Sequence, residues 1–248
     1  MQFVRSRYFD NFEKGSLVVV AQVDHITESH PSEDLLAKAE GQYSTILADP
    51  PWQFQNRTGK MAPEHRRLLR YPTMELKDIM ELPVFQLAAA KSHLYLWVPN
   101  TLLQEGLKVM EAWGFTYKSN LVWYKIRKDG GPDGRGVGFY FRNVTELVLF
   151  GVRGNLRTLS PGRTQVNLFL SRKREHSRKP DEIYDLIESC SPGPYLELFA
   201  RFRRHGWLQW GNENVEDNTH YGVARRKGHV DTQQRLSKIV NGYKGKDE

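Results

Sequence analysis

Short apolar runs alternate with amphipathic stretches along most of the chain. Runs of the length of a β-strand occur at 44–48, 93–98, 120–124, 145–150 and 195–199. Helical stretches fall between several of them, and this alternation is typical of an α/β fold. The chain shows no internal repeat and no low-complexity tract. Its 248 residues suffice for one α/β domain with a full core but not for two, so we predict a single domain.

The clearest helix is predicted from about 102 to 113. Thr101 and Gln104 have the spacing of a capping box, and Gly114 follows the expected end of the helix. The apolar stripe that would face the core consists of Leu103, Leu107 and Met110.

A second helix is predicted to begin near residue 180. Pro180 suits a first helical position, and Asp181 and Glu182 would face the positive end of the helix dipole. The residues Ser-Pro-Gly at 191–193 should end this helix. Its apolar stripe consists of Ile183, Leu186 and Ile187. By contrast, the glycine-rich residues 128–138 predict a loop rather than a phosphate cradle.

Composition limits the class of protein. A net charge of +7 suits a polyanionic partner, although many soluble proteins are mildly basic. The one cysteine, Cys190, cannot form an internal disulfide, which favours a reducing compartment. The sequence has neither an 18-residue apolar run nor a signal peptide in its first 20 residues. We therefore expect a soluble, cytoplasmic protein with no membrane partner, associated with the nucleoid if it is bacterial.

Candidate chemistry follows the first apolar run. Residues 49–52, here named the DPPW motif, are Asp49, Pro50, Pro51 and Trp52. A carboxylate beside proline carbonyls can accept both N–H groups of an exocyclic amine, because proline has no N–H of its own to compete. Trp52 could pack against a flat base. The alternative is a plain strand followed by a proline-rich turn.

Five blocks in a fixed order resemble the MT-A70 family of adenine-N6 methyltransferases over about residues 43–213. After the DPPW motif come Tyr-Pro-Thr-Met at 71–74, His-Leu-Tyr-Leu-Trp-Val at 93–98, Trp-Gly-Phe at 113–115 and Lys-Pro-Asp-Glu-Ile-Tyr at 179–184. The resemblance implies a Rossmann-like methyltransferase fold, S-adenosylmethionine as the donor and N6 of adenine in a nucleic acid as the acceptor. We accordingly divide the chain into an N-terminal extension of unknown role (1–42), a methyltransferase domain (43–213) and a basic C-terminal tail (214–248).

The order of the motifs is expected to be permuted. A βαβ unit needs about 30 residues or more, and only 48 residues precede Asp49. The donor-binding half should therefore follow the catalytic motif, as the resemblance also implies. Its best candidate is 194–213, which contains the run 195–199 but no G-x-G at the following turn.

The resemblance also implies the residues of the two binding sites. Arg201 and Asn212 would contact the donor's ribose side. Glu213 would hydrogen-bond a ribose hydroxyl or the adenine edge, and many relatives have glutamine at this position. Lys179 would pair with the donor's carboxylate, unless it is only a solvated lysine before a helix. The predicted donor-binding residues are Asp49, Lys179, Phe199, Arg201, Asn212 and Glu213.

The predicted acceptor site lies in and after the DPPW motif. A basic stretch there could bind phosphates and hold a flipped adenine, although basic residues are often only a solvated surface. Tyr71 could stack on the base or be a core tyrosine, and Glu146 is expected to support the site. The predicted substrate-binding residues are Trp52, Arg57, Arg66, Arg67, Arg70 and Tyr71.

Four functions fit these residues. We favour adenine-N6 methylation of DNA. The alternatives are the same reaction on RNA, a non-catalytic nucleic-acid-binding subunit, and methylation of a small metabolite. The histidines show no metal-ligand spacing, so no metal is expected. A homodimer or heterodimer is possible within this interpretation.

Overall fold

The computed structural model describes residues 30–53, 73–134, 140–172 and 179–211. The chain divides into two compact units, Met1–His30 and Pro31–Glu248. All the described helices and strands lie in the second unit. Asn212, Glu213 and the predicted substrate-binding residues between 54 and 72 lie outside the described residues.

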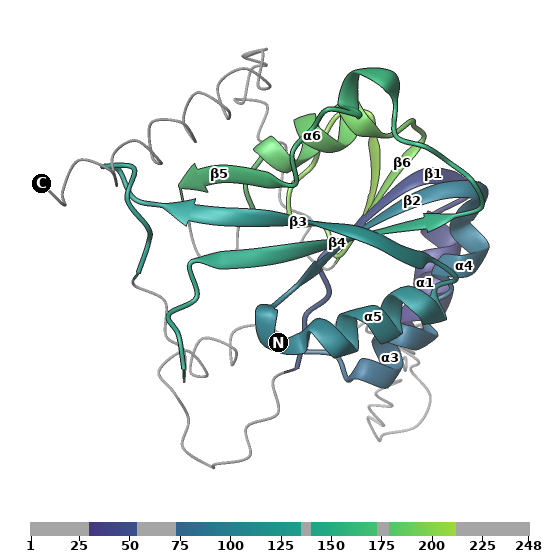
Figure 1. Cartoon of the computed structure of the whole chain (residues 1–248). Coiled ribbons are helices and arrows are strands. Elements are labelled where there is room, and N and C mark those ends of the chain that lie inside the picture. The colour runs from purple at the N-terminus through teal and green to yellow at the C-terminus, as the bar shows by residue number, and fades with distance from the viewer. Residues whose placement is uncertain (1–29, 54–72, 135–139, 173–178, 212–248) are drawn as a thin grey trace, which may run out of the picture. The chain divides into compact units, whose positions relative to one another are not determined.

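A seven-stranded sheet forms the centre of this unit, in the order β5-β3-β4-β2-β1-β6-β7 (Figure 1). Only β4 is antiparallel to its neighbours, and every other pair of adjacent strands is parallel. The strands are β1 (Tyr43–Ala48), β2 (Ala88–Val98), β3 (Thr116–Ile126), β4 (Thr145–Arg153), β5 (Leu168–Arg172), β6 (Tyr195–Leu198) and β7 (Trp207–Trp210). The five predicted strands are all present, and β5 and β7 are additional. The α/β class and the Rossmann-like fold are confirmed.

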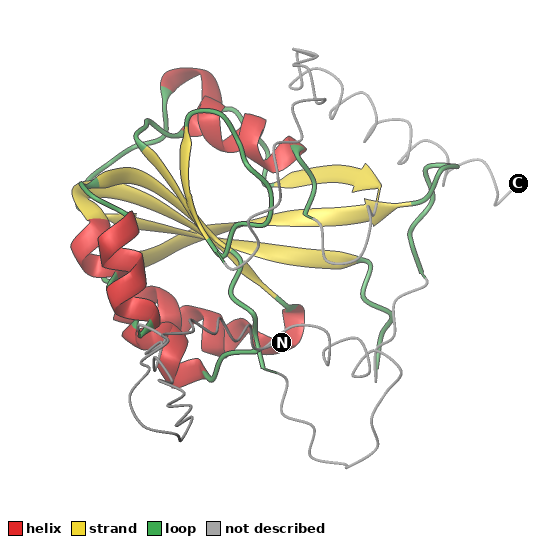
Figure 2. Ribbon diagram, turned by 180° about the vertical axis from the view of Figure 1, so that it is seen from behind, coloured by secondary structure: helices red, strands yellow, loops and turns green. Residues whose placement is uncertain are grey.

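Helices cover both faces of the sheet (Figure 2). The described α-helices are α1 (Pro31–Lys38), α3 (Leu76–Glu81), α4 (Val84–Leu87), α5 (Leu103–Ala112) and α6 (Glu182–Cys190). Buried residues of α1, α3, α4 and α5 belong to one hydrophobic cluster, and those of α6 belong to another. Successive residues of β2 point to opposite faces of the sheet. Leu94 and Leu96 belong to the first cluster, whereas Tyr95 and Trp97 belong to the second. No described helix has the length and hydrophobicity needed to cross a membrane.

Helix α5 lies where it was predicted, but its capping and its buried face differ from the prediction. Thr101 belongs to a 3₁₀ turn, Asn100–Leu102, so it cannot take the extended N-cap conformation, and no side chain caps the helix. Leu103 and Leu107 are exposed rather than buried. The buried positions are Gly106, Val109 and Met110. Glycine at 106 lets the helix approach Val98 of β2 closely.

Helix α6 also differs from its prediction at the first turn. It begins at Glu182 with Asp181 at the N-cap, so Pro180 precedes the helix instead of opening it. The predicted stripe is confirmed, because Ile183, Leu186 and Ile187 are buried. The Ile183 N–H donates to the Pro180 carbonyl, so the chain enters the helix through a turn.

Substitution of Gly106 by valine is expected to destabilise the fold. A Cβ at this position would lie 2.5 Å from Val98 Cγ2 and 3.1 Å from Leu149 Cδ1. Overpacking of this kind typically lowers the free energy of unfolding by about 1–3 kcal/mol. Urea denaturation measures the loss, with Gly134→Val as the control because a Cβ at Gly134 meets nothing within 4 Å. Equal stability of the two variants would contradict the close approach of α5 and β2.

The strand order reverses between β1 and β6, and in open α/β sheets such a reversal leaves a crevice outside the carboxyl ends of the two strands. From β1 the chain continues to β2 on one side, whereas from β6 it continues to β7 on the other. Open α/β sheets bind ligands at such a reversal of strand order. The Asp49 N–H donates to the Leu198 carbonyl at 3.4 Å, which joins the two strand ends. Because the late strands β6 and β7 complete the sheet beside β1, the permuted order is confirmed.

Candidate active site

Four charged side chains meet at the crevice on the face that carries α6. Lys179 Nζ lies 3.1 Å from Asp49 Oδ1 and 3.3 Å from Glu146 Oε2. Lys125 Nζ lies 2.5 Å from Glu146 Oε1. Positive and negative groups thus alternate from Asp49 to Lys125. We refer to Asp49, Lys179, Glu146 and Lys125 as the charge chain.

The strand register explains how these residues come together. Asp49 immediately follows β1, and Lys179 lies three residues before α6. Glu146 is near the amino end of β4, and because β4 is antiparallel this end lies at the same edge of the sheet as the carboxyl end of β1. Lys125 on β3 lies two residues from Trp123, which pairs with Glu146. Lys179 also lies over the Trp97 ring, 4.9 Å from its centroid.

Burial and neighbouring charges compete at the charge chain. Burial raises the pKa of Asp49 above its ordinary value, although Lys179 and Arg201 act to lower it. Burial acts against ionisation of Glu146 as well, but Lys179 and Lys125 outweigh it and lower the pKa of Glu146 to about 2. The pKa of Lys179 is raised, because Asp49 and Glu146 outweigh the effect of burial. Lys179 is therefore an ammonium ion and Glu146 a carboxylate at neutral pH.

The DPPW motif forms a tight turn held by backbone hydrogen bonds. The Trp52 N–H donates to the Pro50 carbonyl at 2.8 Å, and the Met74 N–H donates to the Pro51 carbonyl at 3.0 Å. Each proline carbonyl has a second lone pair for a further donor. Trp52 is only 6% exposed, and its indole N–H donates to the Trp97 carbonyl at 2.9 Å. Trp52 thus anchors the turn to β2, while its contact with a base stays a prediction.

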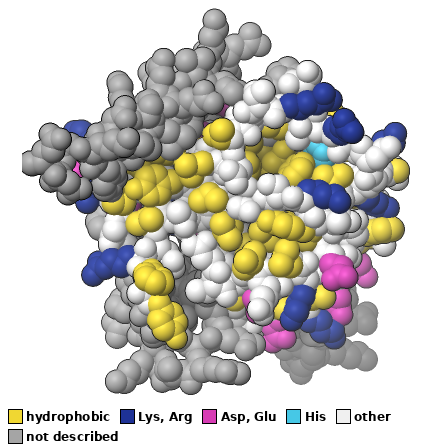
Figure 3. Space-filling view, viewed as in Figure 1, with side chains coloured by type: hydrophobic (Ala, Val, Ile, Leu, Met, Phe, Trp, Pro, Cys, Tyr) yellow, Lys and Arg dark blue, Asp and Glu magenta, His cyan; other side chains and the backbone are white. Residues whose placement is uncertain are grey.

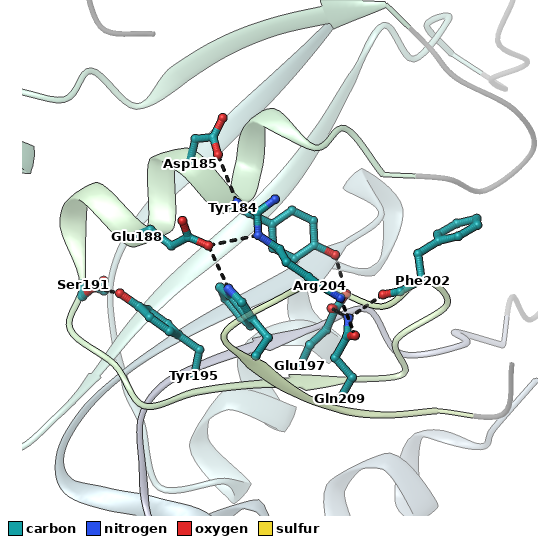
Figure 4. Close-up of polar contacts among 10 residues, drawn as sticks. Tyr184, Asp185, Glu188, Ser191, Tyr195, Glu197, Phe202, Arg204 and Gln209 are labelled. Carbon is teal, nitrogen blue, oxygen red and sulfur yellow. Dashed lines mark hydrogen bonds and ion pairs between the residues drawn. The ribbon is translucent and has the colours of Figure 1, made fainter. Parts of the chain in front are cut away.

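A second polar network fixes the other side of the crevice (Figure 4). Glu197 on β6 accepts hydrogen bonds from the Tyr184 hydroxyl at 2.8 Å and from Gln209 Nε2 at 2.6 Å. The same amide nitrogen donates to the Phe202 carbonyl, and Gln209 Oε1 accepts the Arg204 N–H. These bonds hold the loop after β6 against β7.

Arg204 ties this loop to α6. Its side chain lies over the Tyr184 ring, 4.4 Å from the centroid, and it contacts Asp185 and Glu188 at 3.0 Å each (Figure 4). Trp207 Nε1 also donates to Glu188. A cavity of about 300 Å³ opens beside the loop. Its lining consists of Ala200, Phe202, Arg203, Arg204, Trp207, Gln209 and Gly211.

The cavity adjoins the predicted donor-binding turn. Phe199 leaves β6 with a positive φ of 63°, a conformation that few residues other than glycine adopt, and its ring lies edge-on to Trp210. Arg201 lies close enough to Asp49 for its charge to lower the pKa of that carboxyl. The structure therefore brings the described residues of both predicted sites to one edge of the sheet. These residues are Asp49, Pro50, Pro51, Trp52, Lys179, Phe199 and Arg201.

Two parts of this arrangement were missed by the sequence analysis. Lys125 was not singled out, because its proximity to Glu146 depends on the pairing of β3 with β4. Tyr184 was named only within a motif and Glu197 only as part of the donor-binding candidate 194–213, and the hydrogen bond between them was not predicted. A glutamate in the middle of an apolar strand was a usable signal, because a buried carboxylate needs hydrogen-bond donors.

Ser191 and His93 form a hydrogen-bonded pair with no solvent exposure, so the serine is not accessible as a nucleophile. The Ser191 hydroxyl lies 2.7 Å from His93 Nδ1 and 2.7 Å from the Tyr95 hydroxyl, and all three residues are buried. Burial lowers the pKa of His93. His93 was predicted to begin a strand but lies within β2, because backbone pairing continues through the polar residues before it. Within the described ranges, no three His, Cys, Asp or Glu side chains gather to hold a metal ion.

Glu197 is expected to make stability depend on pH. Burial raises the pKa of Glu197 to about 7, from an ordinary value of 4.5, although Gln209 and Tyr184 lower it. The folded state therefore binds more protons than the unfolded state between these two values, so this contribution to stability is present at low pH and is lost as pH rises towards 8. Thermal melts measure this effect: as the pH rises from 5 to 8, the free energy of unfolding of Glu197→Gln should increase relative to that of the wild type by roughly 1–3 kcal/mol. Parallel curves for the two proteins would exclude this titration.

Comparison with known proteins places the chain among methyltransferases. The family model described as MT-A70 matches residues 43–213. A Mycoplasma protein named type II methyltransferase M.MunI is 31% identical over 193 residues, covering 71% of this chain and 79% of that protein. A rice protein named probable N(6)-adenosine-methyltransferase MT-A70-like is 30% identical over 179 residues, and the human N(6)-adenosine-methyltransferase catalytic subunit METTL3 is 27% identical over 179 residues. Each alignment covers 70% of this chain but only 23% of the rice protein and 28% of the human one.

Proposed function

Because the chain belongs to the MT-A70 family, we propose that it transfers a methyl group from S-adenosylmethionine to N6 of adenine in DNA. The observation that carries the proposal is the position of the DPPW motif. It lies where the strand order reverses, with Asp49 held 3.1 Å from the Lys179 ammonium. A carboxylate, two proline carbonyls and an ammonium ion thus share one crevice.

The acceptor side suits a weakly nucleophilic amine. The lone pair of the adenine amino group is delocalised into the ring, so the enzyme has to hold the nitrogen in a geometry that lets it pyramidalise. Asp49 would accept one N–H, and the second lone pair of the Pro50 carbonyl would accept the other. Asp49 would also stabilise the positive charge that develops on nitrogen. It need not be a strong base, because a methylated ammonium loses its proton readily.

The donor side offers groups of the right charge. S-adenosylmethionine supplies a methyl group made electrophilic by its sulfonium. Lys179 fits its carboxylate, and the carboxylates of the charge chain fit its positive groups. Phe199 and Arg201 flank Ala200 in the chain, and Ala200 lines the cavity of about 300 Å³ beside β6. Asn212 and Glu213 remain predicted donor contacts outside the described residues. The protein's main tasks are alignment and exclusion of water.

DNA is favoured as the polymer, with RNA as the alternative. M.MunI, of which the chain covers 79%, carries the name of a type II methyltransferase, whereas the relatives named N(6)-adenosine-methyltransferases are matched over about a quarter of their length. The net charge of +7 suits either polymer and is unnecessary for a small metabolite. A non-catalytic subunit is disfavoured because the DPPW motif is intact.

The polymer can be identified by mass spectrometry of digested nucleosides. Purified protein is incubated with S-adenosylmethionine and either duplex DNA, single-stranded DNA or RNA. The proposal predicts N6-methyladenine in a DNA substrate. The modified base in RNA alone would select the alternative polymer. Its absence from all three would favour a non-catalytic role or a missing partner subunit.

A further inference from the structure

We propose that Tyr140 and Phe141 form a stacking surface for the bases that flank the target adenine. Both side chains lie almost wholly in solvent: Tyr140 is 93% exposed and Phe141 is 85% exposed. Two adjacent aromatic rings in this state are unusual on a protein surface, where large apolar side chains normally find cover. The inference rests on the proposed function for the identity of the ligand.

The position of the pair ties it to the active site. The connection between β3 and β4 leaves the sheet at the carboxyl end of β3 and returns at the amino end of β4, which is the edge that carries Asp49. Phe141 precedes Glu146 of the charge chain by five residues, a reach of at most about 17 Å. A base next to the target adenine would therefore lie within range of the two rings.

The segment that follows the pair is anchored to the sheet. Asn100, just beyond the carboxyl end of β2, donates through Nδ2 to the Thr145 carbonyl at 3.3 Å and to its hydroxyl at 3.1 Å. Arg142 donates to the Gly134 carbonyl at 3.1 Å. These contacts hold the chain beside the two rings, so the aromatic pair is presented from a fixed base.

Nucleobases fit this surface better than an acidic or purely apolar partner. Every base has a π-face, so stacking on Tyr or Phe is strong and tolerant of sequence. Arg142 follows the pair directly in the chain and Lys128 lies on the other arm of the connection, so both can contact phosphates, whereas Arg127 is held by an ion pair with Asp129. Figure 3 shows the largest group of acidic side chains at the lower right, over α5 and α3, away from the left side where β3 ends. The largest acidic group on this face therefore does not oppose a negatively charged strand at the edge that bears the rings.

The test measures binding of a fluorescent single-stranded oligonucleotide by anisotropy, so it does not require turnover. The double variant Tyr140→Ala/Phe141→Ala should bind about tenfold more weakly or worse. Tyr140→Phe/Phe141→Tyr, which keeps both rings, should retain wild-type affinity. Tyr117→Ala is the matched control, because Tyr117 is 42% exposed at the amino end of β3, the opposite edge of the sheet.

A second oligonucleotide, with abasic sites on both sides of the adenine, separates stacking from charge. The wild type should bind it as weakly as the alanine variant does, and the alanine variant should not distinguish the two ligands. Three results would overturn the proposal. The alanine variant could lose as much affinity, relative to the wild type, for the abasic oligonucleotide as for the intact one, it could bind the intact one as tightly as the wild type does, or the wild type could bind neither. Base-dependent binding without methyl transfer would support the stacking surface while counting against the proposed function.

Discussion

Replacement of Asp49 by alanine is expected to abolish methyl transfer without unfolding the protein. The carboxylate is the only acidic group of the DPPW motif, and it would hold the amine and stabilise its developing charge. Loss of one such preorganised contact typically costs a factor of about 10² to 10³ in rate. Here the loss should be larger still, because the same side chain also holds Lys179 in place. We therefore expect no detectable product.

The matched variant Asp49→Asn separates charge from shape. An amide can still accept one hydrogen bond, but it cannot balance a positive charge, so at most a trace of activity should remain. Stability should not fall, because burial raises the pKa of Asp49 and so opposes its ionised form in the folded state. Asp78→Ala on the exposed side of α3 is the control. Near-normal rates for both Asp49 variants, with unchanged circular dichroism, would remove Asp49 from the mechanism.

Replacement of Lys179 by methionine is expected to have the second largest effect. The substitution removes the proposed partner of the donor's carboxylate and leaves Asp49 and Glu146 without the cation they share. Loss of one partner from a fully buried charge pair costs about 2–5 kcal/mol. Lys179 and Asp49 are 25% and 23% exposed, so we expect the lower end, about 2 kcal/mol or roughly thirtyfold in affinity. The dissociation constant of S-adenosylmethionine, measured by calorimetry, should rise by this factor or more.

The pH profile distinguishes this role from a merely structural one. Lys179 lowers the pKa of Asp49, so its removal should shift the acidic limb of the rate profile to higher pH. Lys77→Met is the control, because Lys77 forms an exposed ion pair with Glu81 on α3. An unshifted profile with unchanged donor affinity would show that Lys179 serves neither Asp49 nor the donor.

The strands of the fold were predictable because their burial leaves a direct trace in the sequence. Five apolar runs correspond to five strands, and strands covered on both faces, such as the parallel pair β1 and β2, read as continuous apolar segments. Strand β7 was missed because Trp207–Trp210 is short and includes Gln209. The face of α5 was predicted correctly at Met110 but wrongly at Leu103 and Leu107, because Gly106 carries no hydrophobic signal although it packs closely against Val98 of β2.

The candidate site was only partly predictable, for a physical reason. The motif and the resemblance indicated Asp49 and Lys179, but their contact depends on the entry to α6 and on the ends of β1 and β6. The link from Glu146 to Lys125 depends on the antiparallel register of β3 and β4. Sequence spacing does not encode such cross-strand neighbours, whereas backbone pairing places them in contact.

The most direct measurement follows a labelled methyl group from donor to product. Wild-type protein and Asp49→Asn are incubated in parallel with DNA and S-adenosylmethionine that carries a deuterated methyl group, and the nucleosides are analysed by mass spectrometry. The account predicts that the wild type places the deuterated methyl group on N6 of adenine and that the variant leaves at most a trace. Label on another atom or base, or equal labelling by both proteins, would contradict it.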